Sequence, residues 1–494
     1  MPCMPNRPRT WEYTVINKLT DRLPEFAASP GLVRRATAVA ALLLLASCES
    51  LMPPQPVQVV PRPVGDSEWS RTSAAPAVAA GALLPWRSYF DDPDLQALIA
   101  LALVHNSDMR LAVINIAQAQ AQWGIRGADQ LPTVNAVAGV TRAPNVYGAQ
   151  TTTVTTGLAV TAYEFDFFGR IGGLKEQALA QYLATQEARR TTQITLVTLV
   201  AQAWIALLAD ARNLELAQQA LASRQASLDL LRLRAAHGVS SALELRQSES
   251  FLEGVRITLA QLERQMALDE NALTLLLGQA VPQAQVARFQ AARFTQFSLP
   301  ELPAGLPSEL LVRRADICQA EQGLKAANAN IAAARAAFFP RISLTATAGV
   351  ASTELGTLLS SGTLAFSLAP QVLMPLFDAG RNRATWELAR AAAEASMVQY
   401  EKSVQVAFRE VADALATRAG WARQLQAQQA QTQADMERLR LVALRLEHGA
   451  ASQLDVLELE RTVLADQQAL TAAQWAYLQS QVTLYKVLGG GPEE

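Results

Sequence analysis

The sequence predicts a mainly α-helical, internally duplicated protein with a small transmembrane β portion. Three observations indicate this fold class: two long stretches without proline, a repeat of the chain at a fixed offset, and four short stretches of alternating apolar and small polar residues. The chain has 494 residues, half of them apolar, and a net charge of −2. This balance argues against a nucleic-acid-binding protein, which needs basic residues to neutralise phosphates.

The N-terminal segment has the pattern of a bacterial export signal. Arg34 and Arg35 precede an apolar run, Ala36 to Ala46, that is about half the length of a membrane-spanning helix. The run ends in Leu45-Ala-Ser-Cys48, which matches the lipobox at which a cysteine sulfur receives lipid. We therefore predict a lipoprotein signal peptide at 1–47, with an unusually long polar start, and a tether rich in Pro, Ala and Ser at 48–85. A plain secretory signal with an incidental cysteine is the alternative.

Two arms of the chain are dominated by strong helix formers. No proline occurs between Asn145 and Val281, or between Leu376 and Gly491, and leucines recur at heptad spacing in both arms. Each arm is expected to form a long helix, a tight His-Gly turn and a shorter return helix. The first long helix, 170–236, would measure about 100 Å at 1.5 Å per residue.

The two arms are copies of one another. Their aligned His-Gly turns, at His237 and His448, lie 211 positions apart, and a shorter copy precedes each arm. Glycines after the histidines are expected in the left-handed conformation, and serines three positions later are expected to help start the return helices. These observations predict a first repeat at 86–282, a linker at 283–306, a second repeat at 307–489 and a tail at 490–494.

Four stretches with period-two alternation are predicted β-strands: 133–143, 151–167, 341–351 and 363–377. This pattern is typical of strands in a transmembrane barrel, although a half-buried sheet in a soluble domain gives the same period. Four strands are too few to close a barrel, and unpaired strand edges are not viable in lipid. Several chains would therefore contribute strands to one barrel, and three chains would supply twelve.

Five segments carry a resemblance to a known family: the lipobox at Cys48, 306–316 (LPSELLVRRAD), 333–340 (AARAAFFP), 372–381 (VLMPLFDAGR) and 445–457 (RLEHGAASQLDVL). With these segments the chain, over about residues 85–490, resembles the TolC-like outer-membrane factors, in their lipoprotein (NodT-type) efflux branch. It departs from the family pattern at Ala315, where proline is usual, and at Cys318, where arginine is usual.

The resemblance implies a homotrimer in the outer membrane of a Gram-negative bacterium, lipid-anchored and extending far into the periplasm. Its long hairpins would form a tunnel of twelve helices, an α-barrel, and its strands a shared 12-stranded β-barrel. The implied partners are a periplasmic adaptor and an inner-membrane pump of the RND type. The implied function is the passive exit duct of a tripartite efflux system for drugs and toxic compounds.

The resemblance also assigns residues to the far tip of the tunnel. Contact with the adaptor would fall on the two turns, at His237, Gly238, Ser241, His448, Gly449 and Ser452. Asp455 and Glu458 share a helix face, and threefold symmetry would make carboxylate rings that favour cations and narrow the entrance. The alternative for this pair is that both are ordinary solvated helix charges.

Two other functions remain open at this point. An exit duct of a type I protein-secretion system would share the fold, and a periplasmic coiled-coil adaptor or scaffold would have helices but no pore. An enzyme is not predicted, because no phosphate loop, HExxH, GxSxG or CxxC motif is present. The scattered histidines and cysteines predict no metal site, and the covalent lipid on Cys48 is the one expected non-protein group.

Overall fold

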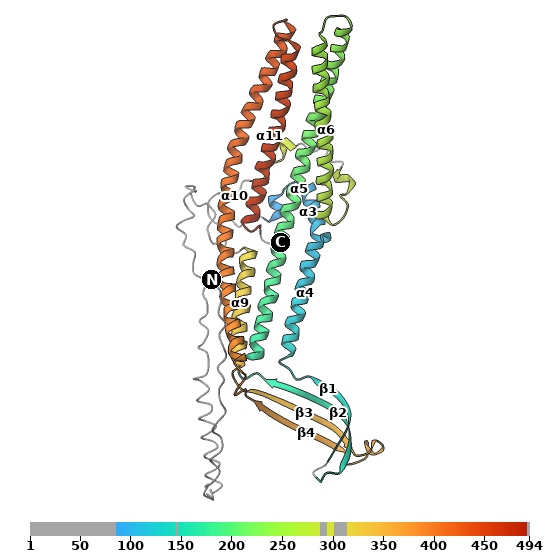
Figure 1. Ribbon diagram of the computed structural model, residues 1–494, viewed down its shortest axis with the longest axis vertical. Coiled ribbons are helices and arrows are strands. Elements are labelled where there is room, and N and C mark those ends of the chain that lie inside the picture. The colour runs from blue at the N-terminus through green and yellow to red at the C-terminus, as the bar shows by residue number, and fades with distance from the viewer. Residues whose placement is uncertain (1–84, 145–146, 287–293, 301–313, 492–494) are drawn as a thin grey trace, which may run out of the picture. The chain divides into compact units, whose positions relative to one another are not determined.

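The computed structural model describes residues 85–144, 147–286, 294–300 and 314–491, which belong to the second of two compact units, 55–494 (Figure 1). The predictions for the signal peptide and Cys48 lie outside these residues, as do the tether before Pro85 and parts of the linker. The longer elements are α3 (Pro93–His105), α4 (Ser107–Ala128), β1 (Val134–Pro144), β2 (Gln150–Phe165), α5 (Arg170–Ala236), α6 (Ala242–Leu277), α9 (Ala315–Ala336), β3 (Arg341–Ser352), β4 (Leu364–Leu373), α10 (Arg381–Glu447) and α11 (Gln453–Val487).

The order of elements confirms the duplicated fold. The series α4-β1-β2-α5-α6 is repeated as α9-β3-β4-α10-α11. Both long helices, α5 and α10, have 67 residues, and α5 has the bounds that the sequence predicts. Both begin after a glycine with a positive φ, Gly169 (75°) and Gly380 (84°), a conformation that costs glycine little.

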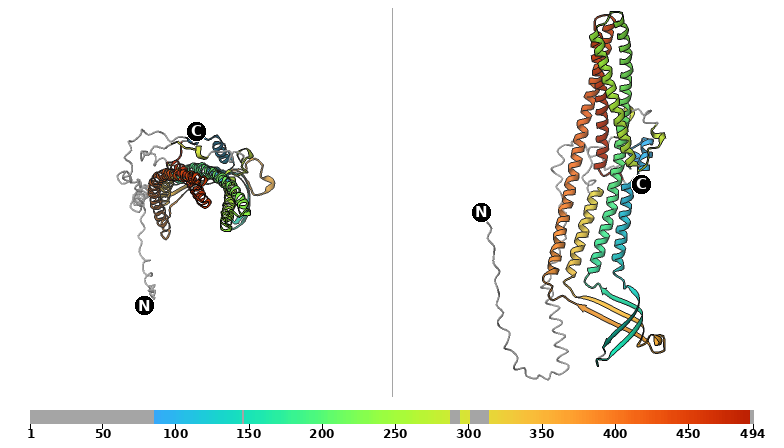
Figure 2. Two further views of the ribbon diagram at one scale, coloured as in Figure 1. Left: turned by 90° about the horizontal axis from the view of Figure 1, so that it is seen from above. Right: turned by 45° about the vertical axis from the view of Figure 1, so that its right-hand side comes forward.

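The long helices pack side by side in a curved wall, which Figure 2 shows from above. Helix α5 packs against α4, α6, α9 and α11, and α10 packs against α9 and α11. Along α5, α9 occupies the half near the strands and α11 the other half (Figure 1). By length and composition α5 could cross a membrane, but 56% of its most apolar window is buried inside the chain, which is the pattern of a core helix.

The largest apolar core lies where the short helices α2 (Trp86–Tyr89) and α3 cover α5 and α11. Tyr89 stacks on Tyr485 of α11 with 4.4 Å between ring centroids, and its hydroxyl donates to the carbonyl of Gln481. Buried Asn106 caps α4 and donates from its amide to the carbonyl of Leu276 at the end of α6. These contacts hold the middle of the wall together.

The strands form one antiparallel sheet in the order β1-β2-β3-β4. Pro144 and Pro370 both lie in the edge strands, where a missing N–H is tolerated. The predicted end of β2 at Phe167 is wrong by two residues, because the chain turns and Asp166 accepts a hydrogen bond from the backbone of Gly172. The predicted end of β4 at Phe377 is wrong by four residues, because Leu373 pairs with Arg341, the first residue of β3, and no strand residue lies opposite the residues that follow.

Candidate functional site

The sheet has an uncovered apolar surface. A shallow groove that crosses all four strands is lined mainly by small and apolar side chains, among them Val134, Leu158 and Phe366, and each of these three is more than half exposed. In the described chain the helices continue beyond the ends of the strands and do not lie across the sheet (Figure 1). The sheet is thus suited to contact lipid and to pair its open edges with other strands.

Aromatic side chains gather where the strands join the helices. Phe168, before α5, stacks on Phe339, before β3, with 4.5 Å between ring centroids. Phe167 and Phe377 occupy the corresponding turns of the two copies and are 69% and 90% exposed. Aromatic girdles of this kind mark the membrane–water interface of barrel proteins. The sequence analysis did not assign this girdle, although its motifs FDFFGR, AFFPR and PLFDAGR were visible.

The hairpin turns lie at the far end of the wall from the sheet (Figure 1). In the first turn, His237 ends α5, Gly238 has a φ of +74°, and Ser241 caps α6 in a reciprocal capping box with Glu244. Val239 is 76% exposed between them.

The second turn repeats this geometry. His448 ends α10, Gly449 has a φ of +72°, and Ser452 caps α11 in a reciprocal capping box with Asp455. Both turns therefore have fixed backbones. The expected left-handed glycines and helix-starting serines are confirmed, while adaptor contact at these residues stays a prediction.

The two proposed gate carboxylates have different local partners. Asp455 accepts hydrogen bonds at 2.8 Å from both the backbone N–H and the hydroxyl of Ser452, and these bonds lower the pKa of Asp455. Glu458 is one turn further along and pairs with Arg461 at 3.1 Å. Asp455 thus belongs to the cap, Glu458 is the freer carboxylate, and Arg461 is a partner that the sequence analysis did not consider.

A buried arginine of the first hairpin lies within the electrostatic influence of charged side chains of the second. Arg224 of α5 donates to the carbonyl of Phe251 at 3.2 Å and lies over the ring of Phe251. Burial lowers the pKa of Arg224, while the carboxylates of Glu460 and Glu458 on α11 act in the opposite direction. Of these carboxylates Glu460 has the larger effect on Arg224, and the positive charge of Arg461 opposes both.

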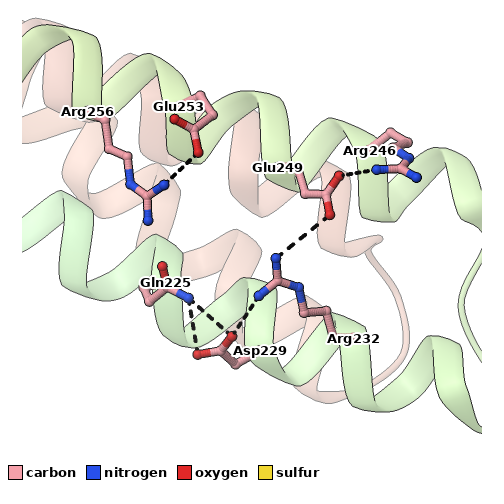
Figure 3. Close-up of polar contacts among 7 residues, drawn as sticks. All are labelled: Gln225, Asp229, Arg232, Arg246, Glu249, Glu253 and Arg256. Carbon is pink, nitrogen blue, oxygen red and sulfur yellow. Dashed lines mark hydrogen bonds and ion pairs between the residues drawn. The ribbon is translucent and has the colours of Figure 1, made fainter.

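The first hairpin also carries charged contacts near its tip (Figure 3). Arg232 of α5 lies between Asp229, at 3.4 Å, and Glu249 of α6, at 3.8 Å, and Arg246 pairs with Glu249 at 2.7 Å. These side chains are mostly solvent-accessible, so salt screens them and each pair contributes little stability. The contact between Arg232 and Glu249 brings opposite charges together where α5 packs against α6.

Among the residues that the structure describes, no group of three or more His, Cys, Asp or Glu side chains is placed to hold a metal ion. Cys318 is half-buried in α9, and burial raises the pKa of its thiol. A raised pKa makes a thiol less nucleophilic at neutral pH, which argues against a reactive role for Cys318.

Comparison with known proteins gives one consistent result. The family model described as outer membrane efflux protein matches residues 98–279 and 306–490. The chain is 41% identical over 430 residues to the toluene efflux pump outer membrane protein TtgC of Pseudomonas putida, covering 86% of this chain and 88% of TtgC. It is 38% identical over 413 residues to the cation efflux system protein CusC of Escherichia coli, covering 82% and 88% of the two chains.

Solved structures agree with these sequence matches. The open state of the Neisseria gonorrhoeae MtrE outer membrane channel has a TM-score of 0.77 and 34% identity, covering 89% of this chain and 98% of MtrE. A crystal structure of CusC has a TM-score of 0.75 and 35% identity, covering 89% of this chain and all of CusC. The predicted fold class is confirmed.

Proposed function

Because this chain belongs to the outer membrane efflux protein family, and is thus the outer-membrane channel component of a bacterial efflux system, we propose that three copies form its complete exit duct. The four-stranded sheet carries this proposal. It is apolar, uncovered and open at both edges, and lipid tolerates no open edge. Three sheets joined edge to edge would give twelve strands, enough for a closed barrel.

The duct would receive its cargo from two partners. The exposed hairpin tips are suited to an end-on contact with a periplasmic adaptor, which would in turn connect them to an inner-membrane pump of the RND type. The matched relatives are named for efflux of toluene and of cations, which favours small toxic molecules over secreted proteins as cargo. The family members are channels, and the proposed function needs no catalytic step.

The N-terminus would attach each copy to the membrane. Lipid on Cys48 would insert in the same membrane as the barrel, and two or more acyl chains on one residue suffice for stable anchoring. The tether that follows, 48–85, would then run from the lipid to α2. Metabolic labelling with a radioactive fatty acid, compared between the wild type and Cys48→Ala, tests this part.

At the tip, Glu458 is the carboxylate best placed to act on passing ions. Three copies would give a ring of three Glu458 side chains, reinforced by Asp455 where the cap leaves one of its oxygens accessible. Rings of carboxylates favour cations and can narrow a pore electrostatically.

Planar-bilayer conductance of the purified mature protein tests the duct. We expect discrete conductance steps that favour cations, and a rise in open probability with loss of cation preference in the double variant Asp455→Asn, Glu458→Gln. Glu447→Gln, at the exposed end of α10 beside the same turn, is the control and should behave as the wild type. The complete absence of conductance in all variants, from a protein shown by electron microscopy to be monomeric, would support the periplasmic scaffold instead.

A further inference from the structure

Each helical hairpin contains two aspartates that face one another across its seam, the line along which the long helix packs against the return helix. In the first hairpin these are Asp210 of α5 and Asp269 of α6, and in the second they are Asp435 of α10 and Asp466 of α11. The two pairs are not equivalent positions of the repeat, because the shift of 211 residues aligns Asp210 with Trp421 and not with Asp435. The pairs therefore lie at different heights along the two hairpins. Two negative charges on helices that pack together repel each other, so each pair destabilises its hairpin unless something offsets the repulsion.

In the second pair one of the two aspartates is almost fully covered. Asp466 is only 8% exposed; its Oδ1 accepts from the Gln431 amide at 3.2 Å, and its backbone carbonyl accepts from the Thr432 hydroxyl at 3.2 Å. Its Oδ2 is buried without a hydrogen-bond partner. The charged group acting on Asp466 is the carboxylate of Asp435, whose own cation, Arg438, lies 3.6 Å away on the exposed side of α10.

The first pair has the same arrangement. Oδ2 of Asp210 is buried without a hydrogen-bond partner, and the charged group acting on Asp210 is Asp269. Asp269 accepts from the Gln265 amide at 3.2 Å. One turn from Asp210, the buried Oδ1 of Asn213 also lacks a hydrogen-bond partner. The contact between α5 and α6 therefore contains two buried hydrogen-bond acceptors, the oxygens of Asp210 and Asn213, that have no donor.

A proton supplies that donor in both seams. We propose that each aspartate pair binds one proton from the surrounding water, and that this proton bridges the long helix to its return helix and makes the packing of both hairpins pH-dependent. With the proton bound, one carboxyl O–H donates to the other carboxylate, a short and strong type of hydrogen bond. When the proton returns to water, two negative charges remain in the seam and push the helices apart.

The direction of the pH effect follows from the electrostatics. Burial, and then Asp269, raises the pKa of Asp210 to about 7, and burial, and then Asp435, raises the pKa of Asp466. For an acid whose pKa is higher in the packed state, the stabilisation is present at low pH and is lost as pH rises through the packed-state value. The first hairpin should therefore be tightest in mildly acidic surroundings and loosen as pH rises through about 7, and the second should change in the same direction, which bears on how readily the tunnel between them widens.

Hydrogen–deuterium exchange of the assembled protein tests the proposal at about pH 5.5 and pH 8, with rates corrected for the intrinsic effect of pH. We expect amides beside Asp210 to lose about tenfold in protection at the higher pH, since pH 8 lies about one unit above the pKa of Asp210 and each unit corresponds to a factor of ten, and amides beside Asp466 to lose protection in the same direction. Asp210→Asn and Asp466→Asn should remove this loss, because an amide donates to the facing carboxylate at every pH. If either variant fails to assemble, Asp269→Asn or Asp435→Asn makes the same test from the opposite helix.

Two matched controls separate the pairs from general charge effects. Asp229→Asn in α5 and Glu437→Gln in α10 neutralise exposed carboxylates that already have cationic partners, and both should keep the wild-type pH response. Equal loss of protection in the wild type and in the seam variants, or no loss in the wild type, would overturn the proposal. Either result leaves conductance, and hence the proposed duct, unaffected.

Discussion

Gly157 of β2 and Gly349 of β3 are paired across the sheet, and neither position has room for a side chain. A Cβ on Gly157 would meet the backbone carbonyl of Ala348, and a Cβ on Gly349 would meet that of Thr156. In a flat sheet a Cβ points out of the plane and away from the partner backbone. The clash therefore marks a sharp bend, of the kind that glycine permits at the corner of a barrel.

Alanine at either of these glycines should block barrel formation. Gly157→Ala and Gly349→Ala would force the two strands apart, and a chain that cannot pair its strands cannot complete a shared barrel. We expect little or no trimer in the outer membrane, measured by gel mobility of unheated membrane extracts. Gly139→Ala on β1 is the control, because its Cβ would lie 3.7 Å from the Thr155 hydroxyl, an ordinary contact. Normal trimer in all three variants would contradict the bend.

The side chain of Arg314 connects three helices at the middle of the wall and is 9% exposed. It pairs at 2.7 Å with Asp316 at the start of α9 and with Glu410 of α10, and it donates to the carbonyl of Val487 at the end of α11. Arg314→Met would leave Asp316 and Glu410, which are 37% and 35% exposed, without their cation, a loss of about 1–3 kcal/mol because water partly screens both carboxylates. We expect a lower midpoint of urea unfolding, followed by helical circular dichroism.

The exposed pair Arg409–Asp413 provides the control for Arg314. Its atoms are 3.9 Å apart and both side chains are mostly accessible, so Arg409→Met should cost less than about 1 kcal/mol. The double variant Arg314→Met, Glu410→Gln should recover part of the lost stability, since it removes one of the two carboxylates that have lost their cation. A single variant as stable as the wild type would show that the three-helix contact contributes nothing.

Local sequence signals were enough to predict the helices and the turns. The bounds of α5 depend on Gly169 and Gly238, whose left-handed backbones stop helix propagation on either side of a heptad pattern. The strand ends were less predictable, because alternation continues past the last residue that has a partner. β2 stops at Phe165 since the chain turns at Asp166, whose carboxylate accepts from the backbone of Gly172 in the first turn of α5, a local contact that no periodicity shows.

The partners of charged side chains could not be predicted, because they depend on the register between helices. Asp435 and Asp466 are far apart in sequence, and their meeting requires a specific alignment of α10 with α11. Glu458 differs, because its partner Arg461 lies three residues further along the same helix, and this spacing could have predicted the pair. Patterns within one helix show which side chains share a face and do not show which face meets a neighbour.

Removing Arg461 should strengthen the electrostatic effect of Glu458. Arg461 pairs with Glu458 at 3.1 Å, so Arg461→Gln leaves a ring of uncompensated carboxylates at the tip of a trimer. We expect a stronger preference for cations, measured as a larger shift in reversal potential under a salt gradient, and the effect should shrink at high salt. Arg440→Gln on α10, which removes a cation paired with Glu437 away from the turn, should leave the reversal potential unchanged. A weaker cation preference in Arg461→Gln would contradict the role of Glu458.

Proline at position 315 should stabilise the start of α9. Ala315 is the first helical residue, where a backbone N–H has no partner within the helix and proline's fixed φ suits the geometry. The preceding Arg314 has φ −60° and ψ 139°, which is the extended conformation that a following proline requires. Ala315 also lines an open pocket of about 610 Å³ together with residues of α5, α10 and α11.

The gain from Ala315→Pro should be about 0.4–1 kcal/mol, because proline reduces the freedom of the unfolded chain without straining the folded one. A higher midpoint of thermal unfolding, followed by circular dichroism, would show it. Ala326→Pro, in the interior of the same helix, is the matched control and should lose roughly 3 kcal/mol, since it removes a helical hydrogen bond. If Ala315→Pro lowers the midpoint as Ala326→Pro does, the helix begins before residue 315 and the backbone of Arg314 is not extended.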